Sequence, residues 1–353
     1  MALGGTERVA VRLARSWAEQ GQDVRIFCGE ESGPLRTLAG ERVRIVAADP
    51  PVPRAPGSVR RLALAAANHL ADCPADILFV PGNFHWPVVA RVAALPVARR
   101  PVIVAQVSAA LRKPQRSGLR QISYDLRMRA LLRKADGLVA LSDSARDQAA
   151  AIVRGPIVRT IASPALDDDL PPPTLATGRM VMAAGRLVPE KGFATLIRAM
   201  ARLDDPDATL TIVGAGPEAE RLRALGDALG LGGRLHMPGY QPDIRPWLDR
   251  ARLFVLSSDF EGYPAVMIEA FAAGRPIVAT DCTPATAAML SDPERGRVVP
   301  IGDAPAMADA MAVMLDRTPP DPAPLAAAVA PHRLSDAASQ YLAFFAELRE
   351  RRR

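Results

Sequence analysis

This chain is poor in several features that mark out particular classes of protein. Among its 353 residues there are 3 cysteines, and aromatic side chains make up only 5%. Cys28, Cys73 and Cys282 are widely spaced and form no CxxC pair, which argues against a zinc site or a disulfide framework and indicates reduced thiols in a cytosolic protein. No apolar run is long enough to span a bilayer.

The charge is also unevenly distributed. The net charge is +6, and the first 172 residues carry 24 Lys and Arg against 16 Asp and Glu, whereas the remainder carries 20 against 22. Lysine occurs only at positions 113, 134 and 191. The basic first part indicates either an anionic partner or a well-solvated basic face.

Helix-like and strand-like segments alternate along the whole chain, and hydrophobic residues make up 49% of it. Strands are predicted at 23–28, 43–48, 76–80, 101–107, 137–141, 157–161, 180–184, 208–213, 252–256 and 276–280, with helices between them. Such alternation predicts an α/β protein with parallel sheets that are covered on both faces.

The segment "DDDLPPP" at 167–173 divides the pattern, because three acids followed by three prolines continue neither a helix nor a central strand. We expect a Rossmann-like domain over 1–166, a linker over 167–175, a second Rossmann-like domain over 176–334, and a helix over 335–353 that crosses back to the first domain. The chain opens directly at a glycine turn and a helix, so we expect that a first strand belongs upstream and was missed or removed, the alternative being a degenerate domain.

The stretch "AAGRLVPEKGF" at 183–193 follows a predicted strand, so its loop lies at the strand's carboxyl end, where open α/β sheets bind ligands. Arg186 and Lys191 flank the turn, and two such cations suit a diphosphate. Two solvated charges on an ordinary loop are the equal alternative.

The stretch "LTIVGAGPEAERL" at 210–222 matches G-x-G-x-x-A from Gly214 to Ala219, between a strand and a helix. The motif lies on the second strand of its domain and no clean acidic strand end follows, so a nicotinamide site is the less favoured interpretation. Pro217 as a first helical residue would explain the turn on structural grounds.

The stretch "FEGYPAVMIEAFAAGRPIVAT" at 260–280 is an apolar helix with one acid. Pro264 suits the helix start and would leave the amides of Ala265 and Val266 free to hold phosphate oxygen. A helix that is apolar all round is normally buried, so Glu269 needs a partner from another segment or from a bound molecule. Glu261 precedes the helix, and both carboxylates can accept hydrogen bonds from hydroxyl groups.

Two features of the first domain are weaker signals. Gly4 and Gly5 stand just before a helix, where bare amides can donate to an anion, although a tight turn explains them equally. His85 follows the strand that ends near Pro81, so it is either a structural histidine or a residue beside the ligand crevice.

The segment 111–134 is strongly basic, since one acid, Asp125, stands among the cations Arg112, Lys113, Arg116, Arg120, Arg127, Arg129, Arg133 and Lys134. It could lie on an anionic lipid surface, bind a lipid-linked diphosphate acceptor, or simply be a solvated helix face. Nucleic acid is not favoured as a partner, because no aromatic residues are interleaved and no known binding module is present.

Together these stretches resemble the retaining glycosyltransferases of the GT-B fold, family 4. The resemblance runs along nearly the whole chain and consists of the Gly4-Gly5 opening, "GRLVPEKG", "IVGAGPE" and "FEGYPAVMIEAFAAGRPIVAT". The last is that family's paired-glutamate motif, E-x7-E, with Gly262, Pro264 and Gly274 in register. The family's fold implies two Rossmann-like domains with parallel sheets that face each other across a cleft.

The resemblance implies a role for each matching residue. Arg186 and Lys191 would bind the donor diphosphate, with help from the Gly5 amide, and Glu269 would hold the ribose. Glu261 would contact hydroxyls of the donor sugar, and His85 would lie near the reacting sugar. The remaining donor contacts would come from the neighbouring motif residues Gly4, Gly214, Gly262, Tyr263, Pro264, Ala265 and Val266.

The implied activity is a cytoplasmic or membrane-peripheral retaining transfer of a sugar, from a nucleoside diphosphate sugar to a glycan or lipid-linked acceptor in bacterial polysaccharide or glycolipid synthesis. No metal or other cofactor is expected, because cations are present and no DxD pair stands where it could hold a metal. The chain departs from the family pattern in two places. After 276–280, "DCTPATAAML" replaces the usual glycine pair and glutamate, which affects the donor pocket. The first strand is missing, which affects the Gly5 contact. A sugar-nucleotide epimerase, a phosphorylase and a non-catalytic nucleotide-sugar binding module stay open as alternatives, and donor, acceptor and oligomeric state are undetermined.

Overall fold

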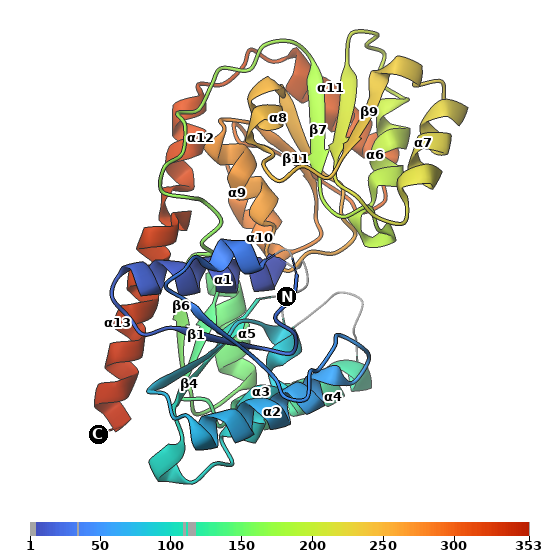
Figure 1. Cartoon of the computed structure of the whole chain (residues 1–353). Coiled ribbons are helices and arrows are strands. Elements are labelled where there is room, and N and C mark those ends of the chain that lie inside the picture. Colours follow the sequence, from blue (N-terminus) through green and yellow to red (C-terminus); the bar gives the residue numbers. More distant parts are fainter. Residues whose placement is uncertain (1–4, 34, 109–110, 112–117, 353) are drawn as a thin grey trace. The chain divides into compact units, whose positions relative to one another are not determined.

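The computed structural model describes residues 5–33, 35–108, 111 and 118–352. The chain divides into two compact units, one formed by residues 1–168 with 332–353 and the other by residues 169–331. Each unit is a parallel α/β layer structure (Figure 1). The α/β class with parallel sheets in two domains, predicted from the alternation, is therefore confirmed.

The first unit contains two parallel sheets among its described residues, one of order β1-β2 and one of order β3-β4-β5-β6. The first strand, which we expect upstream of the Gly4-Gly5 turn, concerns no described residue and stays a prediction. The strands are β1 (Arg25–Cys28), β2 (Arg44–Ala47), β3 (Ile77–Val80), β4 (Val102–Val107), β5 (Gly137–Ala140) and β6 (Ile157–Thr160). The helices are α1 (Gly5–Glu19), α2 (Ser58–Asp72), α3 (Pro87–Val92), α4 (Gly118–Leu132), α5 (Asp143–Ile152) and α13 (Leu334–Arg352).

Helices cover both faces of the four-stranded sheet. On one face, apolar residues of α2, α3, α4 and α5 pack in a single cluster with Val80, Ile103 and Leu138. On the other face, α1 and α13 pack against Val102, Val104 and Val139. Because the central strands β4 and β5 are buried on both sides, their side chains are almost all apolar, which is why they could be recognised as strands of a parallel sheet.

The final helix α13 returns to the first unit, as expected from the sequence. Tyr341, Phe344 and Phe345 lie in the cluster under α1, and the Tyr341 hydroxyl donates a buried 2.7 Å hydrogen bond to Oε1 of Gln106. No helix among the described residues is long and apolar enough to cross a membrane.

The second unit is one parallel sheet of order β12-β11-β10-β7-β8-β9 among its described residues. Its strands are β7 (Met180–Ala184), β8 (Thr209–Val213), β9 (Leu235–Gly239), β10 (Leu253–Leu256), β11 (Ile277–Thr280) and β12 (Gly296–Val299). Its helices are α6 (Phe193–Met200), α7 (Ala219–Ala228), α8 (Arg245–Arg250), α9 (Ala265–Ala272), α10 (Pro284–Met289), α11 (Ala304–Asp316) and α12 (Pro322–Ala328). Helices α6, α7 and α11 share one core cluster on one face, while α9 contacts β10 and β11.

The boundaries between the units differ slightly from the predicted 166/167 and 334/335. Asp167 and Asp168 belong to the first unit, because Asp167 forms an ion pair with Arg12 at 2.7 Å and Asp168 accepts a hydrogen bond from Ser335 Oγ at 2.6 Å. On the other side, Thr174 is held in the second unit by Arg275, whose Nη2 donates to the Thr174 carbonyl at 2.6 Å.

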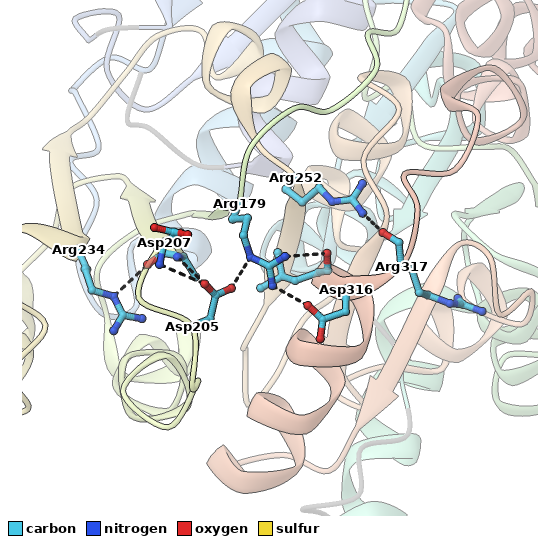
Figure 2. A network of polar contacts seen from close by, with 9 residues as sticks. Arg179, Asp205, Asp207, Arg234, Arg252, Asp316 and Arg317 are labelled. Carbon is cyan, nitrogen blue, oxygen red and sulfur yellow. Dashed lines mark hydrogen bonds and ion pairs between the residues drawn. The ribbon is translucent and has the colours of Figure 1, made fainter.

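A network of charges supports the amino edge of the second sheet, where the strands begin (Figure 2). Arg179, just before β7, forms ion pairs with Asp205, just before β8, and with Asp316 at the end of α11. Arg252, just before β10, donates to the Arg317 carbonyl. The supporting charges therefore lie at the edge opposite to the carboxyl ends of the strands.

Candidate functional site

The candidate site of the second unit is built at the carboxyl ends of β7, β8 and β10. The loop 185–192 leaves β7, and Gly214 leaves β8 so close to it that a Cβ on Gly214 would lie 1.8 Å from the Gly185 carbonyl oxygen. Gly192 has φ +63°, and a Cβ there would lie 2.0 Å from the Ser257 carbonyl oxygen. Glycine at these positions is therefore explained by close packing of loops at one edge of the sheet.

Lys191 and Glu261 meet in this region. The Lys191 ammonium lies 2.5 Å from Glu261 Oε1, and the two side chains are only 21% and 13% exposed. Ser258 Oγ donates to the same carboxylate oxygen at 2.8 Å. The structure thus brings together Lys191 and Glu261, two of the predicted site residues. A single carboxylate oxygen of Glu261 accepts hydrogen bonds from both the Lys191 ammonium and the Ser258 hydroxyl.

Three residues directly after β10, Ser257, Ser258 and Asp259, complete this cluster and were not predicted. Ser257 Oγ donates to the Lys191 carbonyl at 2.8 Å, and the Asp259 amide donates to the Glu190 carbonyl at 2.9 Å. Burial raises the pKa of the Asp259 carboxyl above its usual range. The signal for these residues was available, because "SSD" directly follows an apolar strand at the edge where ligands bind.

Arg186 lies on the same loop but is much more exposed. Its side chain is 70% exposed and faces Glu190 at 3.6 Å. This ion pair does not join it to Lys191 or Glu261. A weak surface ion pair of this kind leaves the guanidinium available to another anion.

The segment from Gly262 to Val266 leads into α9 and differs in one respect from expectation. The prediction that the Ala265 amide is free is wrong, because this amide donates to the Tyr263 carbonyl at 2.9 Å, whereas no bond from the Val266 amide to a described backbone carbonyl is seen. Pro264 precedes the first helical residue as its N-cap. Burial raises the pKa of Tyr263 to about 12, so its hydroxyl stays protonated at neutral pH.

Glu269 is less buried than an all-apolar helix suggests. The fully buried residues of α9 are Met267, Ile268, Ala270, Phe271 and Ala272, while Ala265, Val266 and Glu269 are only partly covered. Glu269 lies three positions after Val266 and four after Ala265, so its side chain shares their face of the helix. Glu269 therefore lies on the same helix face as Val266, about one turn further along.

His85 lies in the first unit, in the short 3₁₀ turn Asn83–His85 after β3. A Cβ on Gly82 would lie 2.5 Å from Thr6 Cγ2. The start of α1 therefore lies against the turn that carries His85. Gly5 is the first residue of α1, whereas Gly4 lies outside the described residues.

The surroundings of His85 favour its neutral form. Burial lowers its pKa below 6.5, the nearby Glu7 opposes that shift, and Arg54 adds to it. Nδ1 is buried without a hydrogen-bond partner among the described residues. Arg54 lies 3.4 Å from Glu7 and 5.6 Å from the ring centre of the exposed Phe84. The region thus offers an uncharged imidazole beside a cation and an exposed aromatic ring.

Within the described part of the chain, no three His, Cys, Asp or Glu side chains are grouped as a metal site would need. Of the basic segment, Arg112, Lys113 and Arg116 lie outside the described residues. The others lie on α4 or directly after it.

Comparison with known proteins identifies the family of each unit. The family "Glycosyl transferase 4-like domain" matches residues 4–164, and "Glycosyl transferases group 1" matches residues 178–317. LpsE of Rhizobium meliloti (strain 1021), described as a lipopolysaccharide core biosynthesis glycosyltransferase, is 41% identical over 138 residues, or 39% of this chain and 40% of that protein. The chain thus spans less than half of that relative's length.

A longer match covers both units. The phosphatidyl-myo-inositol mannosyltransferase of Mycolicibacterium smegmatis is 30% identical over 282 residues, which are 74% of this chain and 69% of that protein. The crystal structure of Anabaena HepE in complex with UDP has a TM-score of 0.76 at 17% identity, covering 98% of this chain and 96% of that one, and shows the shared fold. The chain therefore belongs to the glycosyltransferases of family 4, glycosyl transferases group 1, and has their GT-B fold.

Proposed function

We propose that this protein moves a sugar, of the hexosyl type, from a nucleoside diphosphate sugar to a hydroxyl group of a glycan or lipid-linked acceptor, with retention of the anomeric configuration. The observation that carries the proposal is the half-buried Lys191–Glu261 pair at the carboxyl edge of the second sheet. A glycan or glycolipid acceptor is supported by relatives named for lipopolysaccharide core synthesis and phosphatidyl-myo-inositol mannosylation.

In the proposed mechanism, residues of the second unit stabilise the negative charge that develops on the leaving group. Lys191 and Arg186 offset the negative charge on the diphosphate as the bond to the sugar breaks, and the Val266 amide adds a donor. Glu261 then accepts a hydrogen bond from the donor sugar, and Glu269 one from the ribose. His85 and the Gly5 amide keep the roles that the family resemblance implies.

The donor test is a thermal shift measurement with UDP, GDP and ADP sugars. One nucleotide series is expected to stabilise the protein, because a ligand that binds only the folded state raises stability by about 2.7 kcal/mol at 100 times its Kd. Glu269→Ala is expected to abolish this shift. Glu294→Gln, at the amino edge of the same sheet, serves as the matched control.

Turnover separates a transferase from the alternatives. Release of nucleoside diphosphate with formation of a glycosylated acceptor supports transfer, and NMR of the product decides whether the anomeric configuration is retained. Binding without turnover would favour a non-catalytic nucleotide-sugar module, and conversion of the donor alone would favour an epimerase.

Metal independence is proposed because Lys191 and Arg186 can supply the positive charge that a divalent ion would otherwise provide. EDTA is then expected to leave the rate of transfer unchanged. Loss of activity in EDTA with recovery in Mn²⁺ would contradict this part of the proposal. We also propose a cytoplasmic, membrane-peripheral place for the enzyme in bacterial cell-surface polysaccharide or glycolipid synthesis.

A further inference from the structure

Helix α4 of the first unit has an unusual exposed face. Leu119, Ile122 and Leu126 are 84%, 55% and 58% exposed. Their spacing of three and four residues places them in one stripe along the helix. Met128 and Leu132, on the opposite side, are buried in the cluster beneath the helix. The exposed stripe is therefore separate from the apolar face that packs α4 against its unit.

Cations border this apolar stripe on both sides. Within the helix, at 100° per residue, Arg129 lies on one side of the stripe and Arg120 and Arg127 lie on the other, while Arg133 and Lys134 follow the last helical residue. All five are exposed. Arg129 is anchored in place by a 3.0 Å hydrogen bond from its Nε to the Ile152 carbonyl.

The exposed face carries no acid. Asp125 is the only acid between residues 118 and 134, and it is half-buried and accepts a 2.5 Å hydrogen bond from Gln121 Nε2. A solvated helix face normally mixes charges of both signs and seldom aligns large apolar side chains. A central apolar stripe with cationic borders is instead the pattern of a helix that lies in the headgroup layer of an anionic membrane.

We infer that α4 is a membrane-docking helix, which inserts Leu119, Ile122 and Leu126 among anionic lipids while its bordering cations contact the headgroups. This inference rests on the membrane-peripheral placement proposed above and names the surface responsible. Charge complementarity selects the occupant, because the cations suit a lipid surface of negative charge and the stripe suits its acyl boundary.

The experiment is co-sedimentation of the whole protein with vesicles of phosphatidylcholine alone and with vesicles of phosphatidylcholine and phosphatidylglycerol in equal parts. Binding is expected only to the anionic vesicles and is expected to weaken with salt. The variant Arg127→Gln/Arg133→Gln should bind about 25-fold more weakly, since each basic residue near the surface contributes about fivefold. Leu119→Ser/Ile122→Ser/Leu126→Ser should lose tenfold or more (an order-of-magnitude figure).

Matched controls separate this surface from general charge and apolarity. Arg202→Gln/Arg223→Gln removes two exposed arginines of the second unit, and Val97→Ser removes an apolar side chain that is 80% exposed in the first unit. Both controls should bind anionic vesicles like the natural protein. Equal weakening in a control and in the α4 variants would overturn the inference.

Two further readouts complete the test. If the stripe were a contact between copies of the chain, the triple serine variant would change the sedimentation coefficient while vesicle binding stayed the same, and the inference would fail. Vesicle binding is measured without sugar nucleotide, and nucleotide-induced thermal shifts are measured without vesicles. Failure of the docking helix is therefore distinguishable from failure of the proposed transferase.

Discussion

At the scale of single residues, the central feature of the second unit is the ion pair between Lys191 and Glu261. One carboxylate oxygen accepts from both Lys191 Nζ and Ser258 Oγ. An incoming diphosphate would compete with that oxygen for the ammonium, and Ser258 would continue to hold the carboxylate. In the proposed complex, the Lys191 ammonium would therefore contact both Glu261 and the diphosphate of the sugar donor.

Lys191→Gln is expected to lower kcat/KM for transfer by about 10²–10³-fold, because a donor aimed at developing negative charge is lost. Transfer assays with the natural protein and the variant measure this effect. Glu190→Gln, which alters only the exposed partner of Arg186, is the control and should retain nearly full activity. A fully active Lys191→Gln enzyme would remove this residue from the mechanism.

His85 provides a second prediction, concerning pH. Its folded pKa is lowered by burial, so the unfolded chain binds more protons between that lowered value and the usual 6.5. Stability is therefore fully present above about 6.5 and is lost as the pH falls toward the folded pKa. His332, whose pKa burial also lowers, contributes in the same direction.

Denaturant unfolding at a series of pH values should therefore show a shallower acid slope for His85→Gln than for the natural protein. The slope should not vanish, because His332 remains. NMR should show the His85 ring titrating below 6.5, and titration above that value would contradict the expected shift.

At the scale of elements, the sequence predicted every strand that the described residues form, except two in the second unit. The missed strands, β9 and β12, are the two edges of that sheet. β9 contains Pro238 and alternates between partly buried and exposed residues, and β12 begins at Gly296. Edge strands tolerate proline and polar residues that a central strand excludes, so their local pattern is weak.

Helix α13 is the element whose role depends most on distant packing. Phe344 is fully buried in the cluster shared with α1 and β4. Phe344→Ala should destabilise the first unit by about 3–5 kcal/mol, because a large aromatic side chain leaves a cavity. Gln340→Ala, at an exposed position of the same helix, should change stability by less than about 0.5 kcal/mol. Equal midpoints in urea for the two variants would contradict this role of α13.

At the scale of the molecule, the supporting charges and the proposed donor site lie at opposite ends of the strands of the second unit. The network around Arg179 lies where the strands begin (Figure 2), whereas Lys191, Glu261 and α9 lie where they end. All strands of a parallel sheet run in one direction, so their amino ends lie along one side of the sheet and their carboxyl ends along the opposite side. Changes at one edge can therefore affect stability without altering the site.

Arg179→Met tests this separation. Loss of the contacts to Asp205 and Asp316 should lower stability by about 1–3 kcal/mol, since hydrogen bonds to charged groups are removed and Asp205 stays largely buried. The nucleotide-induced thermal shift should keep its size. A variant that is folded at the assay temperature but has lost nucleotide binding would show that the two edges are coupled.

Local sequence determined the alternation of helices and strands, the segment that separates the two units, and the loops at the carboxyl ends of the strands. These features follow from hydrophobic periodicity and from proline and glycine, which act on neighbouring residues. Only the tertiary structure decided that Lys191 pairs with Glu261, 70 residues away, that Glu269 lies on a half-exposed helix face, and that the Ala265 amide donates to Tyr263. Such contacts depend on the order of strands in the sheet and on which face of each helix is covered, and a local pattern carries neither.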